Sequence, residues 1–358
     1  MKRVQKYLYM FVFYILLNYN NLKDLVLPIS LRNQERMEFT DIRLRSLLHY
    51  DPEAKSFSPS STIKYFRMPE DHEYPLDLAK NYKNYVHRNN EYPGDFDMVQ
   101  YYFEHVNKLE FIRQDYDVFC CRRLLIILIN IPYLNFDKRE SIEAFRVKGC
   151  IFLRLQTDHI NVEAERSSYT FKARQLLFSD APGQGIDMDA PIDERAQTYG
   201  MFSARLGQFR LLYSCEVPGV ANTKKLGDLT DPKELEKCSL ATIRVLKKPL
   251  SWRHTFRHYS WLLQNYFCGG SQLAVASFDQ NGIVSKKIEV VSADDLIESK
   301  RSDLQSGFKK MNDFLEQIKQ KLDKIDNPNV SLKFTFDKNK LVFDEAFKTD
   351  FVDYANQF

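Results

Sequence analysis

Short apolar runs bounded by polar or turn-forming residues recur along the chain and predict several strands. Residues 203–217 have the pattern of central strands, and Asn281-Gly282, a strong hairpin signal, joins two further strand patterns. Between 304 and 325 the apolar residues recur instead at helical spacing. The chain therefore mixes the two periodicities.

Three further segments complete this pattern. Residues 124–131 form a nearly continuous apolar run before Pro132, which predicts a buried element of either type. Residues 145–155 resemble a strand pair, and the apolar residues of 252–266 follow a helical period. Together, these strand and helix patterns predict an α+β fold in which a mixed central sheet is flanked by helices.

The composition of the first 61 residues differs from that of the rest. Residues 18–61 are mostly polar without clear periodicity, and 56–61 are rich in Ser and Pro, as is typical of a loop that enters a domain. We therefore expect an N-terminal apolar segment and irregular linker over 1–61, and one domain over 62–358.

Charge and cysteine content exclude some classes of protein. The net charge is +3, so a nucleic-acid site would have to be a local patch. The six cysteines are scattered, without the paired spacing of a zinc site or the density of a disulfide framework. We expect reduced, mostly buried thiols and a nuclear or cytoplasmic protein.

The N-terminus offers an alternative location. Basic residues precede the apolar run 7–17, which has the charge and length of a signal-peptide core. No small-residue cleavage site follows it, which favours a docked or dispensable helix. A secreted or membrane-tethered interaction protein is the alternative.

One strand carries the candidate chemistry. Residues 211–217 are apolar except near their end, where Glu216 precedes Val217-Pro218. Side chains two residues apart on a strand point the same way, so such a strand can present two carboxylates to one cation. Here the second position is Pro218, which cannot bind metal.

From about Thr62 to Phe343 the chain resembles the eukaryotic decapping exoribonuclease family (DXO and its relatives). The resemblance is carried by four segments in the family's order: Cys121-Arg122-Arg123-Leu124-Leu125, Arg205-Leu206-Gly207, Ser214-Cys215-Glu216-Val217, and the helix with Trp261 and Gln264. It implies a core of the D-(D/E)XK nuclease type. It also implies removal of incomplete or non-canonical caps from RNA 5′ ends with divalent metal ions such as Mg²⁺.

The resemblance implies roles for three residues of this chain. Arg122 lies where the family's arginine contacts RNA, and Gln264 where its glutamine lies beside the scissile phosphate. Glu216 matches a carboxylate that binds metal and substrate. Each could instead be structural: Arg122 a surface arginine, Gln264 a solvated residue, and Glu216 a carboxylate paired with a nearby base.

The departures from the family pattern are mostly losses of acid. Its Gly-x-x-x-Glu segment aligns with residues 168–172, which places Lys172 at the glutamate. Its second strand aspartate is Pro218, and its Glu-hydrophobic-Lys strand places Arg244 at the acid. With Glu216, the four positions sum to +1 where the family carries −4.

This charge disfavours two-metal catalysis. Paired Mg²⁺ ions need clustered carboxylates, and one misplaced cation at contact costs about 4 kcal/mol at an effective dielectric of 20. Two alternatives stay open: Glu216 pairs with Lys172 or Arg244 in a cationic site, or unaligned acids substitute as ligands. The candidate acids are Glu163, Glu165 and Asp180.

We therefore expect a decapping-family protein that acts on or binds RNA 5′ ends with weakened hydrolysis. The alternative is a catalytically inactive paralogue that binds RNA or a 5′–3′ exoribonuclease. Basic and aromatic residues interleave over 244–261, a mixture that suits single-stranded RNA and also a helix with a solvated face.

Overall fold

A computed structural model of the chain describes residues 38–87, 115–130, 140–147, 149–157, 164–247, 256–298, 301–325, 330–337 and 340–348. The chain divides into two units, Met1–Arg36 and Met37–Phe358, and the described residues belong to the second. The apolar run 7–17 lies outside them. Among the described residues, no helix combines the length and the hydropathy needed to cross a membrane.

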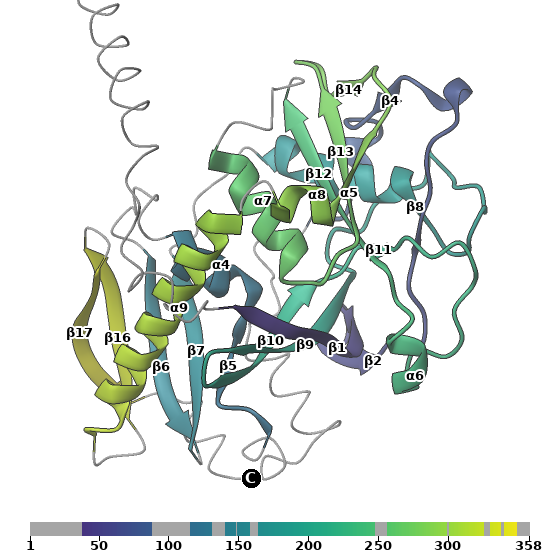
Figure 1. The fold of residues 1–358 in the computed structure, drawn as a ribbon. Coiled ribbons are helices and arrows are strands. Elements are labelled where there is room, and N and C mark those ends of the chain that lie inside the picture. Colours follow the sequence, from purple (N-terminus) through teal and green to yellow (C-terminus); the bar gives the residue numbers. More distant parts are fainter. Residues whose placement is uncertain are drawn as a thin grey trace, which may run out of the picture. The chain divides into compact units, whose positions relative to one another are not determined.

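Within the described residues, nine strands form the larger sheet (Figure 1). Their order is β17 (Lys340–Lys348), β16 (Val330–Asp337), β6 (Glu140–Val147), β7 (Cys150–Thr157), β5 (Val118–Cys121), β10 (Phe209–Glu216), β9 (Gln197–Leu206), β1 (Phe39–Asp51) and β2 (Ser56–Pro59). β5 runs parallel to β7 and β10, and the other pairs are antiparallel. The sheet is therefore mixed, as the sequence predicts.

A second sheet supplies the other side of the candidate site. Its order in the described chain is β15 (Glu289–Ser292), β13 (Gln272–Phe278), β12 (Leu240–Lys247), β11 (Gly219–Val220), β3 (Tyr65–Phe66) and β8 (Phe178–Ser179). β12 and β13 are parallel. A short pair is formed by β4 (Leu76–Asp77) and β14 (Ile283–Val284). Because β10 and β11 are separated by only two residues, the chain passes directly from one sheet to the other after Glu216.

Helices pack against both sheets. They are α4 (Arg122–Asn130), α5 (Ala164–Leu177), α6 (Pro232–Leu235), α7 (Phe256–Tyr266), α8 (Ala293–Glu298) and α9 (Arg301–Leu322), with 3₁₀ turns η2 (Asp71–Glu73) and η3 (Tyr82–Asn84). α4 contacts α7, α9 and β10, whereas α5 contacts β12. The predicted α+β architecture is confirmed.

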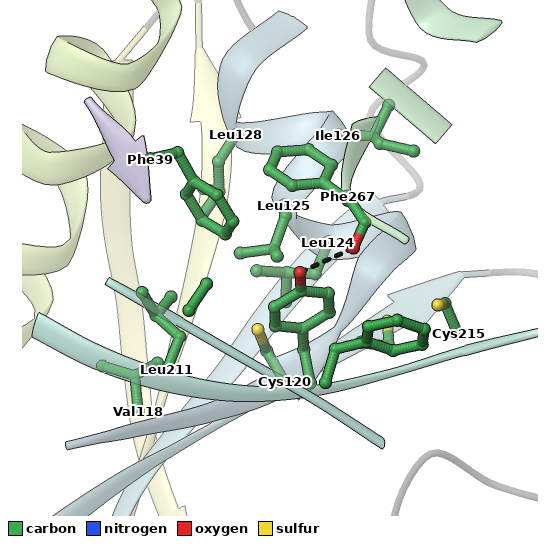
Figure 2. Packing of buried hydrophobic residues seen from close by; sticks show 14 of the residues in the cluster. Phe39, Val118, Cys120, Leu124, Leu125, Ile126, Leu128, Leu211, Cys215 and Phe267 are labelled. Atoms are coloured by element: carbon green, nitrogen blue, oxygen red, sulfur yellow. Dashed lines mark hydrogen bonds between the residues drawn. The ribbon is translucent and has the colours of Figure 1, made fainter. Parts of the chain in front are cut away.

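The main core holds β10 and α4 in a fixed relation. Leu124, Leu125 and Leu128 of α4 are fully buried with Leu211 of β10 in one cluster (Figure 2). The buried Tyr213 hydroxyl donates a 2.6 Å hydrogen bond to the carbonyl oxygen of Phe267. A buried hydroxyl needs such a partner, so this bond ties β10 to the end of α7.

Residues 39–59 correct the expected irregular linker. They form β1 and β2, and β1 pairs with β9 over most of its length. Two register shifts, at Thr40/Arg43 and Leu44/Ser46, interrupt its pairing with β9. Ile42 and Leu44 do alternate with the exposed Arg43 and Arg45, but this strand pattern covers only four residues of a mostly polar segment.

The predicted hairpin at Asn281-Gly282 is only partly correct. The turn forms, with Gly282 at φ 82°, a backbone conformation that favours glycine. However, β14 then pairs with β4, and the partner of β13 is the later strand β15. The apolar residues of 98–109 recur at helical spacing and predict a helix, but this segment lies outside the described residues.

Candidate functional site

Glu216 is the last residue of β10, and the register of the sheet brings it close to the start of α4. Ser214 pairs with Cys121 on the parallel strand β5, and Arg122 begins α4 immediately afterwards. The ends of β5 and β10 therefore place a cation and an anion at the same edge of the sheet. The Glu216 side chain is 23% exposed.

Arg174 of α5 binds both carboxylate oxygens of Glu216. Its Nη1 donates to Oε1 at 2.6 Å, and its Nη2 donates to Oε2 at 2.9 Å. Nη1 also donates to Oε1 of Gln197 on β9 at 2.8 Å. This bidentate arrangement is the strong geometry of an arginine–carboxylate pair, and it uses both oxygens that would face a metal ion.

Two more arginines act on the same carboxylate. Arg122 and Arg244 each experience the charges of both Glu216 and Arg174, and Arg244 also experiences that of Arg122. Arg122 donates from Nη1 to the main-chain carbonyl of Gln264 at 3.2 Å, which fixes its direction. We call Arg122, Arg174, Arg244 and Glu216 the arginine cluster.

The electrostatic state of Arg244 reflects this crowding. Burial, followed by repulsion from Arg122 and Arg174, lowers the pKa of Arg244 to about 9, and Glu216 offsets only part of the effect. Three guanidiniums and one carboxylate leave the arginine cluster with a net charge of +2. The side chain of Arg244 is charged at neutral pH, at an electrostatic cost.

Neutral thiols lie beside these charges. Burial raises the pKa values of Cys215 and Cys268, so both remain protonated. The Cys268 Sγ donates to the carbonyl oxygen of Asn265 at 3.1 Å. The thiols contribute no negative charge, and the net charge of the cluster stays +2.

Lys172 does not pair with Glu216. It is fully buried, and its Nζ donates to Oε1 of Gln175 and to the carbonyl of Met188, both at 2.7 Å. Residues two apart on a helix differ by about 200° in direction, so Lys172 and Arg174 leave α5 on nearly opposite sides. Lys172 instead holds the loop around Met188 against α5.

Arg174 is the site residue that sequence reasoning missed. The spacing of the family segment fits residues 168–172 and, shifted by two, residues 170–174 equally well. Because residues two apart on a helix point to nearly opposite sides, only one of these registers can face Glu216, and the structure shows that it is the one ending at Arg174. The alternative pairing of Glu216 with Lys172 is therefore wrong. The basic residue that pairs with Glu216 is Arg174.

The other candidate residues are placed as follows. Pro218 follows β10 and offers no side-chain ligand. Gln264 reaches Arg122 through its main-chain carbonyl. Asp180 forms a surface ion pair with Lys64 at 3.3 Å and is 78% exposed, so it does not substitute for the missing acids. Glu163, the side chain of Glu165, and residues 248–255 lie outside the described part.

A divalent metal does not fit the residues described here. Hard cations such as Mg²⁺ or Mn²⁺ require several oxygen ligands, and in the described ranges no group of three or more acidic, histidine or cysteine side chains could hold one. Glu216 already shares both oxygens with Arg174. Three nearby guanidiniums would repel the ion further.

Comparisons with known proteins agree with the fold. No curated protein sequence matches this chain significantly. The structure of Candida albicans Rai1 in complex with pU5-Mn²⁺ matches with a TM-score of 0.68 and 12% identity, over 90% of this chain and 92% of that one. Scheffersomyces stipitis Rai1 in complex with (3′-NADP)⁺ and calcium ion matches with a TM-score of 0.67 and 11% identity, over 90% and 94% of the two chains.

A third structure extends the comparison to a related enzyme. K. lactis Dxo1 in complex with manganese matches with a TM-score of 0.58 and 15% identity, over 87% of this chain and 92% of that one. The family model described as RAI1 like PD-(D/E)XK nuclease matches residues 46–355. The predicted resemblance is confirmed, and the chain belongs to the RAI1-like PD-(D/E)XK nuclease family.

Proposed function

We propose that this protein binds RNA 5′ ends through the arginine cluster and hydrolyses them far more slowly than family members with a complete set of acids. The observation that carries the proposal is the bidentate pair between Arg174 and Glu216, in which the guanidinium binds both carboxylate oxygens that a metal ion would need. Arg122 and Arg244 reinforce this positive charge.

The binding half of the proposal draws on the family. Relatives of the same fold have been crystallised with pU5 and with (3′-NADP)⁺. Guanidiniums bind phosphate oxygens in bidentate fashion, and the cluster supplies three of them near the edge where β5 and β10 end. An RNA end can therefore be held by this chain's own cations.

The hydrolytic half follows from charge. Arg174 and Arg244 each impose a repulsion on a bound cation of about 2 to 4 kcal/mol after partial screening, which corresponds to a loss of roughly 10³-fold or more in metal affinity. Metal bound this weakly supports little two-metal chemistry. Mg²⁺ as the cofactor of any remaining activity, a 5′–3′ exoribonuclease partner, and a nuclear or cytoplasmic location stay predictions.

Hydrolysis and binding are tested together on the full-length protein. RNA with a 5′ triphosphate or an NAD cap is incubated with Mg²⁺ or Mn²⁺ beside K. lactis Dxo1, and binding of the same RNAs is followed by fluorescence anisotropy. We expect binding together with hydrolysis at least ~100-fold slower than that of the relative.

Two variants make the outcome specific. Arg122→Gln should weaken RNA binding, whereas Arg301→Gln, which removes a 61% exposed arginine of α9 that pairs with Glu298 of α8, should not. Hydrolysis as fast as that of the relative, abolished by Glu216→Ala, would contradict the proposal. So would RNA binding that Arg122→Gln leaves unchanged.

A further inference from the structure

The charge of the arginine cluster sets the kind of anion that it can hold. Its net +2 equals the magnitude of the charge on a phosphate monoester dianion, whereas an internal phosphodiester of RNA carries only −1. A terminal 5′ phosphate is the group in RNA that matches this charge. An RNA with a 5′ hydroxyl lacks it.

The Arg244 guanidinium has donor capacity that the described protein does not use. It carries five N–H donors, and no hydrogen bond joins it to another described residue. Protein encloses most of this side chain, yet the residue keeps some contact with solvent. The donors that solvent reaches are available to an anion, which would form charge-assisted hydrogen bonds with them.

The pair between Arg174 and Glu216 already displays the geometry of phosphate recognition. The two parallel bonds of 2.6 and 2.9 Å hold a planar bidentate acceptor, and two oxygens of a phosphate can accept from the same fork. Glu216 therefore stands where a phosphate would bind Arg174, and the two anions compete for one guanidinium.

We propose that the arginine cluster is a metal-independent site for one phosphate monoester dianion, the 5′-monophosphate end of RNA, in which the phosphate takes over Arg174 from Glu216. This inference rests on the proposed function and narrows it to one chemical form of the RNA end. Arg122 and Arg244 supply the further donors. Glu216 acts as the internal anion that holds Arg174 in position before the ligand arrives.

The sign of the effect at Glu216 distinguishes this site from a metal centre. If Glu216 competes with phosphate, Glu216→Gln raises the net charge of the cluster from +2 to +3 and strengthens binding of the 5′ phosphate. If Glu216 held a metal that bridges to the RNA, the same change would weaken binding. Because glutamine has nearly the shape of glutamate, it changes mainly the charge.

The test uses the full chain and two short oligouridylates with a 3′ fluorophore, one with a 5′ phosphate and one with a 5′ hydroxyl. Binding is measured by fluorescence anisotropy in excess EDTA. We expect the phosphorylated RNA to bind at least ~10-fold more tightly at pH 7.5, and this preference to shrink as pH falls below about 6, where the phosphate gains a proton.

The variants complete the design. Arg244→Gln should remove the preference for the 5′ phosphate, Glu216→Gln should increase it by roughly 3- to 10-fold, and the control Arg301→Gln should leave it unchanged. Thermal unfolding with and without inorganic phosphate shows whether each variant is folded and binds the anion.

Two results would overturn the inference. Equal affinity for the phosphorylated and hydroxyl RNAs in EDTA would refute the phosphate site and leave RNA binding itself standing. A loss of the preference in folded Glu216→Gln would show that Glu216 supports binding of the 5′ phosphate and does not compete with it. Failure of both RNAs to bind would instead refute the proposed function.

Discussion

Replacing Glu216 should destabilise the protein more than replacing its partner Arg174. Glu216→Gln removes the carboxylate that acts on three guanidiniums, and leaves those like charges facing one another. Arg174→Gln removes the attraction to Glu216 but also the repulsion of Arg174 from Arg122 and Arg244. The two halves of one ion pair should therefore have unequal effects.

The magnitude follows from the geometry. An ion pair in contact is worth about 4 kcal/mol at an effective dielectric of 20, and partial solvent access reduces this to about 2 kcal/mol. Both side chains have that access, since they are 21% and 23% exposed. Adding the weaker attractions of Glu216 to the other two arginines, Glu216→Gln should cost about 3 kcal/mol, and Arg174→Gln about 1 kcal/mol.

Urea unfolding followed by circular dichroism measures both free energies of unfolding, with Arg301→Gln as the surface control. Inorganic phosphate at equal ionic strength should restore the stability of Glu216→Gln. A ligand at 100 times its dissociation constant adds about 2.7 kcal/mol to the free energy of unfolding. An Arg174→Gln variant as unstable as Glu216→Gln, or a Glu216→Gln variant that responds to phosphate no more than to chloride, would refute the reasoning.

Two further predictions concern residues away from the arginine cluster. Burial lowers the pKa of Lys172, whose hydrogen bonds hold a loop, so Lys172→Met should cost about 1 to 3 kcal/mol in urea unfolding by leaving two partly buried acceptors unpaired. It should not change RNA affinity, and a loss of affinity in the folded variant would show that Lys172 contributes to the site. Burial opposes a low pKa at Asp117, but hydrogen bonds from Arg210 outweigh it and hold the pKa of Asp117 below its ordinary value. A carboxylate whose pKa is lowered in the folded state stabilises the fold above its unfolded-state pKa and loses that contribution as the pH falls through its folded-state pKa. Asp117→Asn should therefore cost about 1 kcal/mol at pH 7, and this cost should disappear on acidification. A cost that persists at low pH in unfolding measured against pH would exclude the ion pair as its source.

The sequence was sufficient for the fold class because hydrophobic period and turn chemistry are local. The apolar run 124–131 corresponds to α4, and the period between 304 and 325 to α9. β1 was not predicted because its alternating residues, 42–45, are few and lie in a mostly polar segment. The pairing of β13 was not predicted because the adjacent strand β14 pairs with β4, and such pairing depends on tertiary contacts.

The site was harder to predict because its members come from four elements that are distant along the chain. Arg122, Arg174, Glu216 and Arg244 meet only when α4, α5, β10 and β12 pack together. Glu216 and two of the arginines could be named from spacing within recognisable segments. Arg174 could not, since a shift of two residues on α5 exchanges it for Lys172, which points into a different environment.

The central claim is that arginines have taken the place of metal ligands beside Glu216. Titration of Mn²⁺ into the full-length protein, followed by calorimetry, tests it most directly when Glu216→Ala is measured in parallel. The variant Arg174→Glu with Arg244→Glu, which restores acids at both positions, serves as the comparison. We predict the same weak heats for the unmodified protein and Glu216→Ala, and saturable binding only in the double variant. Saturable Mn²⁺ binding by the unmodified protein at micromolar concentration, lost in Glu216→Ala, would contradict the account.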